Sequence, residues 1–134
     1  MTGKAENGFD GGRRAVMKFD NLSPDENAAL KHVQKLGKFR KEHPALRYGT
    51  RHNCGTPTGS LWVYKLKCEN GDIIKCKDKY GDDTVIVGIN KGSSAETVDC
   101  GESGTFKSYD ENDTTNYSGG SVTVPAGGSL IIGK

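Results

Sequence analysis

Residues Asp83–Asn90, which read DTVIVGIN, decide the predicted fold of this 134-residue chain. Val85, Val87 and Ile89 alternate with their neighbours, so these three side chains are expected to lie on one face of a β-strand. β-Branched residues pack well on a pleated surface, and they dominate this stretch. We therefore predict the strongest strand of the chain here.

A second alternating stretch, Leu61–Cys68, precedes it in the sequence. Its alternate residues are expected to share the inward face of a strand: Trp62, Tyr64, Leu66 and Cys68. The turn-forming residues Glu69–Gly71 then predict a hairpin that leads into a further strand over Asp72–Lys77.

Weaker strands are predicted further along the chain, over Glu96–Cys100, Thr105–Tyr109, Ser121–Val124 and Ser129–Ile132. The 19 glycines favour turn-rich β-structure over a helical bundle. About six or seven short strands with frequent turns are typical of an antiparallel sandwich. We predict a mainly β fold: an antiparallel Greek-key β-sandwich preceded by one α-helix.

The helix signals lie before the strands. Ser23 and Glu26 have the spacing of a capping box, and Pro24 occupies the first helical position. Pro44 is expected to end the helix near residue 43. Four apolar residues recur at helical spacing and form a stripe that needs a partner surface: Ala29, Leu30, Val33 and Leu36.

Charge is distributed unevenly. Residues 1–52 hold 11 Lys and Arg against 6 Asp and Glu, whereas residues 53–134 hold 8 against 11. The basic stretch Lys31–Arg51 raises a nucleic-acid hypothesis, but a solvated helix face explains it better, so we expect no nucleic-acid partner. No apolar run approaches the roughly 20 residues of a membrane helix, so no membrane partner is expected.

All four cysteines lie in the second part of the chain: Cys54, Cys68, Cys76 and Cys100. Because no Cys-x-x-Cys pair exists, disulfides are a better interpretation than a zinc site. Four cysteines allow three pairings, and the sequence leaves these open. Disulfides indicate an oxidising compartment, and we expect an extracellular, secreted protein.

The order of these segments resembles a known family. The helix ends in Phe39–Thr50, which contains Arg-Lys-x-x-Pro-Ala-Leu-x-Tyr-Gly, and Trp62–Tyr64, Thr84–Asn90, Gly104–Phe106 and Val122–Ser129 follow. This arrangement is similar to the C-terminal end of α-amylases and cyclodextrin glucanotransferases. These are glycoside hydrolases with a (β/α)8 catalytic barrel and a C-terminal β-sandwich.

The resemblance implies three segments: residues 1–22 as the loop after barrel strand eight, 23–52 as the last barrel helix and its exit, and 53–134 as the C-terminal sandwich. Asp10 and Arg14 match the family's Asp and Arg that contact glucose units, so they are expected to bind substrate in an intact parent enzyme. Gly11 replaces the family's usual Pro, and the insert Lys4–Phe9 is unusual.

The family's catalytic carboxylates would precede Met1, so no catalytic residue is expected here. The predicted function is an accessory, stabilising domain of an enzyme that acts on α-1,4-glucans such as starch and maltooligosaccharides. Its expected partner is the parent's catalytic barrel. No cofactor and no metal are implied, and the chain is expected to be a monomer.

A glycan-binding module is the alternative function. Sugar-binding sandwiches stack exposed aromatic rings on sugar faces, and a row of two exposed rings would favour this alternative. The candidate rings are Tyr48, Trp62, Tyr64, Tyr80, Tyr109 and Tyr117. Trp62 and Tyr64 are expected to pack in the core, whereas the tyrosines near turns are expected to be exposed.

Overall fold

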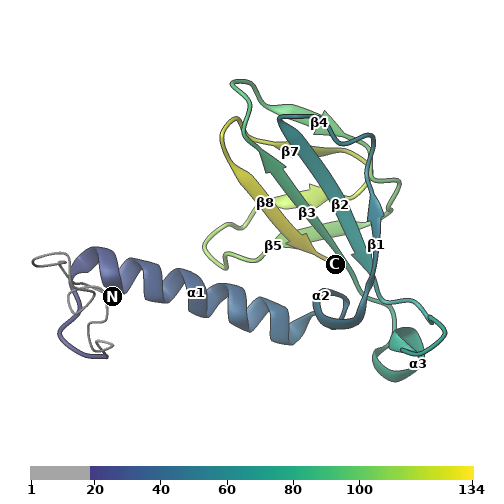
Figure 1. Cartoon of the computed structure of the whole chain (residues 1–134), viewed down its shortest axis with the longest axis horizontal. Coiled ribbons are helices and arrows are strands. Elements are labelled where there is room, and N and C mark those ends of the chain that lie inside the picture. The colour runs from purple at the N-terminus through teal and green to yellow at the C-terminus, as the bar shows by residue number, and fades with distance from the viewer. Residues whose placement is uncertain (1–18) are drawn as a thin grey trace, which may run out of the picture. The chain divides into compact units, whose positions relative to one another are not determined.

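The structure is a computed structural model that describes residues 19–134 (Figure 1). The chain divides into two compact units between Gln34 and Lys35. Three helices are present in the described part: α1 (Pro24–Glu42), α2 (Ala45–Tyr48) and α3 (Cys76–Tyr80). The strands there are β1 (Thr50–Asn53), β2 (Leu61–Lys67), β3 (Thr84–Asn90), β4 (Glu96–Val98), β5 (Thr105–Ser108), β6 (Asn116–Ser118), β7 (Val122–Val124) and β8 (Ser129–Gly133).

Helix α1 begins where the capping box predicts. The backbone N–H of Glu26 donates to Ser23 Oγ at 3.2 Å, and the N–H of Ser23 donates to Glu26 Oε2 at 2.8 Å. The two side chains thus satisfy donors that a helix N-terminus leaves unpaired. The predicted helix is confirmed, but its apolar stripe is not covered within the described residues, because Leu30 and Val33 are exposed.

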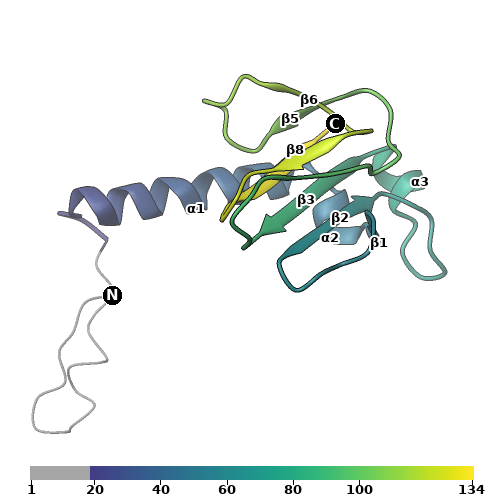
Figure 2. The same cartoon turned by 90° about the horizontal axis from the view of Figure 1, so that it is seen from above.

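The strands form two antiparallel sheets. The larger sheet has the order β1-β2-β3-β8-β5-β6, and the smaller pairs β4 with β7 (Figures 1 and 2). Strand β8 lies between β3 and β5, so neighbours in the sheet are distant in the sequence. The predicted fold class, a mainly β antiparallel sandwich preceded by a helix, is confirmed.

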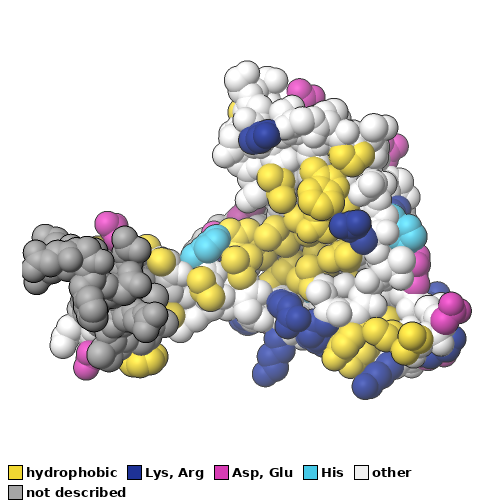
Figure 3. Space-filling model, viewed as in Figure 1, with side chains coloured by type: hydrophobic (Ala, Val, Ile, Leu, Met, Phe, Trp, Pro, Cys, Tyr) yellow, Lys and Arg dark blue, Asp and Glu magenta, His cyan; other side chains and the backbone are white. Residues whose placement is uncertain are grey.

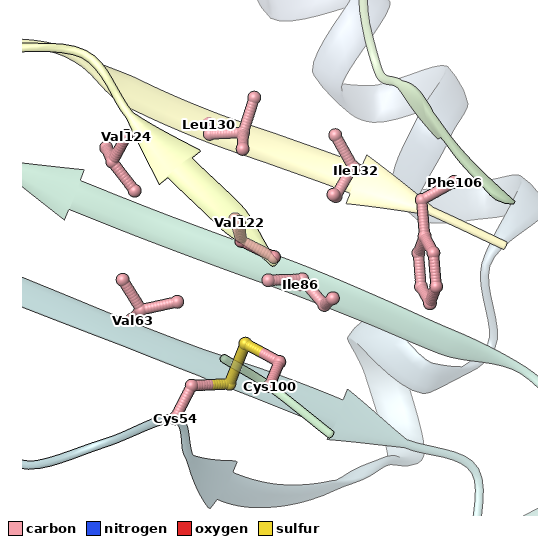
Figure 4. Close-up of a cluster of buried hydrophobic side chains, with 9 residues drawn as sticks. All are labelled: Cys54, Val63, Ile86, Cys100, Phe106, Val122, Val124, Leu130 and Ile132. Carbon is pink, nitrogen blue, oxygen red and sulfur yellow. A yellow bond between two sulfur atoms is a disulfide. The ribbon is translucent and has the colours of Figure 1, made fainter. Parts of the chain in front are cut away.

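One apolar core lies between the two sheets (Figure 4). Its buried residues come from both sheets and from one disulfide: Cys54, Val63, Ile86, Cys100, Phe106, Val122, Val124, Leu130 and Ile132. The sheets approach closely at Gly88, where an added Cβ would lie 2.5 Å from Val124 Cγ2. Only glycine leaves room for this contact.

A second apolar cluster lies on the opposite face of the larger sheet. Helices α1 and α2 contribute Phe39 and Ala45, and β3 contributes Val85 and Val87. Strand β3 is therefore covered on both faces, and only Ile89 among its residues is exposed. This explains why its near-continuous apolar pattern was the clearest strand signal in the sequence.

One strand prediction is wrong, and two strands, β1 and β6, were not predicted. Residues Asp72–Lys77 do not form a strand: Cys76–Tyr80 is a short helix, and Asn70 and Lys75 form only an isolated bridge. The partner of β2 is β3, whose seven residues pair with it in full register. Strand β1, which pairs with the other edge of β2, had not been predicted.

The prediction that Trp62 packs in the core is also wrong. Val63 points into the core between the sheets, whereas Trp62 lies on the other face and remains 37% exposed. Alternation correctly grouped Trp62 with Tyr64 and Leu66, and the latter two pack against the second apolar cluster.

The four cysteines form two disulfides, which confirms the expectation of disulfides and fixes the pairing. Cys54 joins Cys100 and Cys68 joins Cys76, with Cα–Cα distances of 4.8 and 5.1 Å. Among residues 19–134, no helix has the length and apolar character to cross a membrane.

Candidate functional site

An apolar part of the larger sheet is only partly covered in the described residues. We call it the open sheet face and define it as Trp62, Tyr64, Ile89 and Ile131. The strand register places these side chains together, because Trp62 pairs with Ile89, and Tyr64 and Ile131 both pair with Val87. Trp62 is 37% exposed and Ile89 is 46% exposed. Figure 3 shows the apolar side chains that gather over β2, β3 and β8.

The Trp62 ring is held in place on this face. Its Nε1 donates a hydrogen bond to Asn53 Oδ1 at 3.2 Å, and its ring centroid lies 5.0 Å from that of Tyr64. The Arg51 guanidinium lies 5.5 Å from the ring centroid, within the range of a cation–π contact. The indole is therefore both exposed and ordered, as a contact residue needs to be.

The neighbouring end of the same sheet face is closed by the end of α1 and by α2. His43 Nδ1 donates to Asp83 Oδ1 at 2.8 Å, and the Ala45 N–H donates to Asp83 Oδ2 at 2.9 Å. The His43 ring also packs on Phe39, with centroids 4.2 Å apart. An added Cβ at Gly133 would lie 2.5 Å from His43 Cε1, so the absence of a side chain there lets the helix end approach β8.

A second exposed surface lies around α3. We call it the tyrosine patch and define it as Tyr48, Ile73, Ile74 and Tyr80. The rings of Tyr48 and Tyr80 are 41% and 37% exposed, and they stack with centroids 5.5 Å apart and planes 4° apart. Together with Lys75 and Lys79 these residues line a cavity of about 350 Å³.

One disulfide and three hydrogen bonds fix the loop that carries Ile73 and Ile74. The disulfide Cys68–Cys76 closes it, and the Gly71 N–H donates to the Ile74 carbonyl at 2.9 Å. Asn70 donates through Nδ2 to Asp78 Oδ1 at 2.9 Å and accepts the Asp78 N–H at 3.1 Å. Ile73 lies in this loop and is 93% exposed.

A partly buried charge cluster lies on the core side of the larger sheet. Glu102 Oε1 accepts hydrogen bonds from Lys65 Nζ and Lys67 Nζ, both at 2.9 Å, and Lys65 Nζ also donates to the Cys100 carbonyl at 2.8 Å. Burial raises the pKa of Glu102, but the hydrogen bonds from Lys65 and Lys67 outweigh it and hold that pKa below its ordinary value of 4.5. The cluster ties the loop after Cys100 to β2.

Replacement of Glu102 by Gln is expected to destabilise the fold by about 1–3 kcal/mol at neutral pH, because two lysines lose their carboxylate partner. The folded-state pKa of Glu102 is depressed, so its stabilisation is full above the ordinary value of 4.5 and is lost as the pH falls through the folded-state value. Urea unfolding of wild type and Glu102→Gln should therefore show a difference that shrinks in acid.

The exposed Glu96 of β4 provides a matched control, because Glu96→Gln should leave the free energy of unfolding nearly unchanged at every pH. A difference between wild type and Glu102→Gln that stays constant as the pH falls well below 4.5 would contradict the assigned role of Glu102.

The predicted substrate residues Asp10 and Arg14 lie outside the described residues, so their role stays a prediction. Tyr109 and Tyr117, which were expected to be exposed, are half-buried, and the Tyr117 hydroxyl donates to Asp113 Oδ2 at 2.6 Å. Tyr80 is exposed as expected. Residues 19–134 contain no group of three or more His, Cys, Asp or Glu side chains that could hold a metal ion.

Comparison with known proteins identifies relatives of this chain. A cyclomaltodextrin glucanotransferase of Paenibacillus macerans is 31% identical over 123 residues, which are 90% of this chain and 15% of that enzyme. An alpha-amylase of Niallia circulans is 27% identical over 132 residues, covering 97% of this chain and 21% of that protein. The chain is homologous to part of the α-amylase and cyclodextrin glucanotransferase family. The resemblance drawn from the sequence motifs is thereby confirmed.

A third relative, the cyclomaltodextrin glucanotransferase of Geobacillus stearothermophilus, is 30% identical over 95 residues and 71% of this chain. No family model matches the chain. The chain spans only 15% and 21% of the Paenibacillus macerans and Niallia circulans family members, which is consistent with the predicted C-terminal part of such an enzyme.

Proposed function

We propose that this chain is an accessory, stabilising domain of an α-amylase-type enzyme that acts on α-1,4-glucans. The domain packs against the enzyme's catalytic barrel and does no chemistry of its own. The observation that carries the proposal is the open sheet face, an ordered apolar surface on a chain whose relatives are several times longer.

Burial of this face would be favourable. Moving a large apolar side chain fully out of water stabilises a protein by about 1.5–3 kcal/mol, and Trp62 and Ile89 are both partly exposed. Contiguous exposed apolar surface on a folded domain commonly marks an interface. The end of α1 and α2 already cover the adjoining part of the same sheet, so a larger helical layer would extend an existing packing arrangement.

The nearly buried carboxylates support a non-catalytic role. A retaining glycosidase needs two carboxyl groups about 5–5.5 Å apart. Asp83 and Glu102 are both nearly buried, but Asp83 binds His43 on the helix side of the larger sheet, whereas Glu102 binds Lys65 on the core side. Each carboxylate already has its partners, and the sheet lies between them.

An extracellular location is part of the proposal. The two disulfides support secretion, because disulfides persist in an oxidising compartment. Asp10 and Arg14 remain the proposed contacts with substrate in an intact parent enzyme.

A chimera tests the docking role. The matching segment of the Paenibacillus macerans enzyme is exchanged for this chain, and Trp62→Ser and Ile89→Ser are introduced into the chimera and into the isolated chain. Each substitution is expected to cost about 0.5–1.5 kcal/mol more in the chimera, because less than half of each side chain remains to be buried there. Thermal unfolding of the four variants measures this difference.

Ile73→Ser is the matched control, because Ile73 is exposed and apolar but lies outside the open sheet face. It should change the stability of both proteins equally. Equal losses for Trp62→Ser in the chimera and in the isolated chain would contradict docking through this face. The isolated chain should also release no products from maltoheptaose, and hydrolysis by the purified chain would refute the non-catalytic role.

A further inference from the structure

We propose that Asn70–Gly71 is a site of spontaneous deamidation, and that the loop closed by the Cys68–Cys76 disulfide holds this reaction back. In the first step the backbone nitrogen of Gly71 attacks Cγ of Asn70, a succinimide ring forms and ammonia leaves. In the second step water opens the ring and leaves an aspartate or isoaspartate residue. The two steps together consume one water and release one ammonia, so the reaction needs no oxidant, cofactor or enzyme.

The dipeptide has the composition and the exposure that this reaction requires. Among residues 19–134, Asn70 is the only asparagine that is followed by glycine. Both residues are exposed in the loop between β2 and α3, so water can reach them (Figure 1). Glycine has no Cβ to obstruct the attack of its own nitrogen, and its backbone adopts the conformations that ring closure needs. The sequence and the exposure therefore provide a reactive pair.

The folded loop engages both reacting groups. The Gly71 N–H donates to the Ile74 carbonyl at 2.9 Å, which occupies the nucleophile. The amide of Asn70 donates through Nδ2 to Asp78 Oδ1 at 2.9 Å, and its Oδ1 accepts the Asp78 N–H at 3.1 Å. The nitrogen must lose its proton and the amide must turn toward it, so all three hydrogen bonds oppose the attack. Deamidation therefore requires the loop to open.

The disulfide controls how often this loop opens. Between residues 70 and 80 only Cys76 is buried, so little apolar packing resists opening. Segments with few buried contacts open locally at low cost in free energy. The link from Cys68 to Cys76 restricts the conformations of the open loop and so favours the closed one. Loss of the disulfide should raise the open population, and the rate of deamidation should rise with it.

The product cannot restore the closed loop. Deamidation of Asn70 removes the Nδ2 donor and places a second carboxylate within hydrogen-bond distance of Asp78 Oδ1. Two carboxylates at this separation repel each other unless one is protonated. Opening thus permits the reaction, and the reaction then disfavours closing, so the change acts in one direction. Helix α3, which carries Asp78 and Tyr80, would be released from the loop.

Ageing of the full 134-residue chain at mildly alkaline pH tests the proposal. Mass spectrometry of the peptide that contains Asn70, together with labelling by isoaspartyl methyltransferase, measures the product. The double variant Cys68→Ala/Cys76→Ala is expected to deamidate there about tenfold faster than wild type, or more. The matched control is Cys54→Ala/Cys100→Ala, which loses the longer cross-link but keeps this loop closed, and its rate should stay close to that of wild type. A faster reaction in the control would show that deamidation proceeds through global unfolding.

Two further variants identify the reacting groups. Gly71→Ala, added to the Cys68→Ala/Cys76→Ala variant, should remove most of the product, because the new Cβ hinders the attack; it contacts only the Ile74 carbonyl, at 3.5 Å, so the loop accepts it. Asp78→Ala keeps the disulfide but removes the acceptor of the Asn70 amide, and it should also accelerate the reaction. This variant carries the test if the cysteine variant does not fold.

Two results would overturn the proposal. One is a wild-type chain that deamidates at Asn70 as fast as the chain unfolded in urea, because the loop would then give no protection. The other is absence of product at Asn70 in the folded cysteine variant and in Asp78→Ala. Neither result bears on the docking role, which the chimera tests through Trp62 and Ile89.

The effect of the product is tested with Asn70→Asp. Hydrogen exchange at the amides of Gly71 and Asp78 should be faster in this variant than in wild type, because both amides are hydrogen-bonded only in the closed loop. Asn116→Asp is the control, since it makes the same change at an exposed position of β6. Unchanged exchange in Asn70→Asp would contradict the release of the loop.

Discussion

Replacing Cys54 and Cys100 together by alanine is expected to lower the free energy of unfolding by about 4 kcal/mol, because this disulfide closes a loop of 46 residues. Cross-linking restricts the unfolded chain, and the restriction grows with loop length. Both sulfur atoms also lie in the core between the sheets, so their removal leaves unfilled volume. Urea unfolding without added oxidant or reductant measures the loss of unfolding free energy.

The second disulfide is the natural comparison. Cys68 and Cys76 are separated by only 8 residues, so the same entropy argument gives about 2.5 kcal/mol for their double alanine variant. We therefore expect the double alanine variant of Cys54 and Cys100 to lose more stability than that of Cys68 and Cys76. A reversed order would show that loop length does not govern how these disulfides stabilise the fold.

Replacing Phe106 by alanine is expected to cost about 3–5 kcal/mol, because the ring is fully buried between the sheets. The ring also fills the space beside Gly119, where an added Cβ would lie 2.4 Å from Phe106 Cε2. Gly119→Ala alone should therefore cost about 1–3 kcal/mol through overpacking. In the Phe106→Ala background part of this second cost should disappear, because only the close contact with Glu102 Cβ at 2.9 Å would remain.

The double-mutant cycle separates this contact from a general effect of the substitutions. Gly59→Ala is the control for Gly119→Ala, because no other atom lies within 4 Å of a Cβ at Gly59. The double variant should lose less stability than the two single variants together by about 0.5–3 kcal/mol, as expected for residues in contact. Strict additivity would mean that the contact does not exist in solution.

Sequence patterns predicted the helices and strands that are determined by residues close together in the sequence. The start of α1 depends on Ser23 and Glu26, which satisfy one another's backbone donors and need no tertiary partner. Strand β3 was predicted because Val85, Val87 and Ile89 alternate with their neighbours, and this signal lies within one short stretch of sequence. The family was recognised from the order of its motifs and not from any one of them.

Features that depend on distant pairing were missed. The loop from Cys68 to Cys76 reads as a hairpin until the disulfide is known, and four cysteines allow three pairings. The alternation around Trp62 showed which residues share a face, but a sheet with layers on both sides gives two possible interiors. The face that carries Trp62 is buried only at the end that residues of α1 and α2 cover.

The tyrosine patch could not be predicted from the sequence for the same reason. Tyr48 lies in α2 and Tyr80 in α3, and no local pattern connects two residues 32 positions apart in the sequence. Tyr80 had been named as an exposed ring, but its stacking on Tyr48 follows from the position of the disulfide-closed loop. The substrate role of Asp10 and Arg14 rests on the family motif and stays a prediction.

The position of β8 has a consequence for the order in which the domain can assemble during synthesis. Strands β1, β2 and β3 emerge from the ribosome first and can pair as neighbours, and β5 can pair with β6. These two groups of strands cannot join into one sheet until Ser129–Gly133 has been synthesised, because β8 pairs with both β3 and β5. Until then the edge of β3 that pairs with β8 stays unpaired, and unpaired edges of this kind promote aggregation.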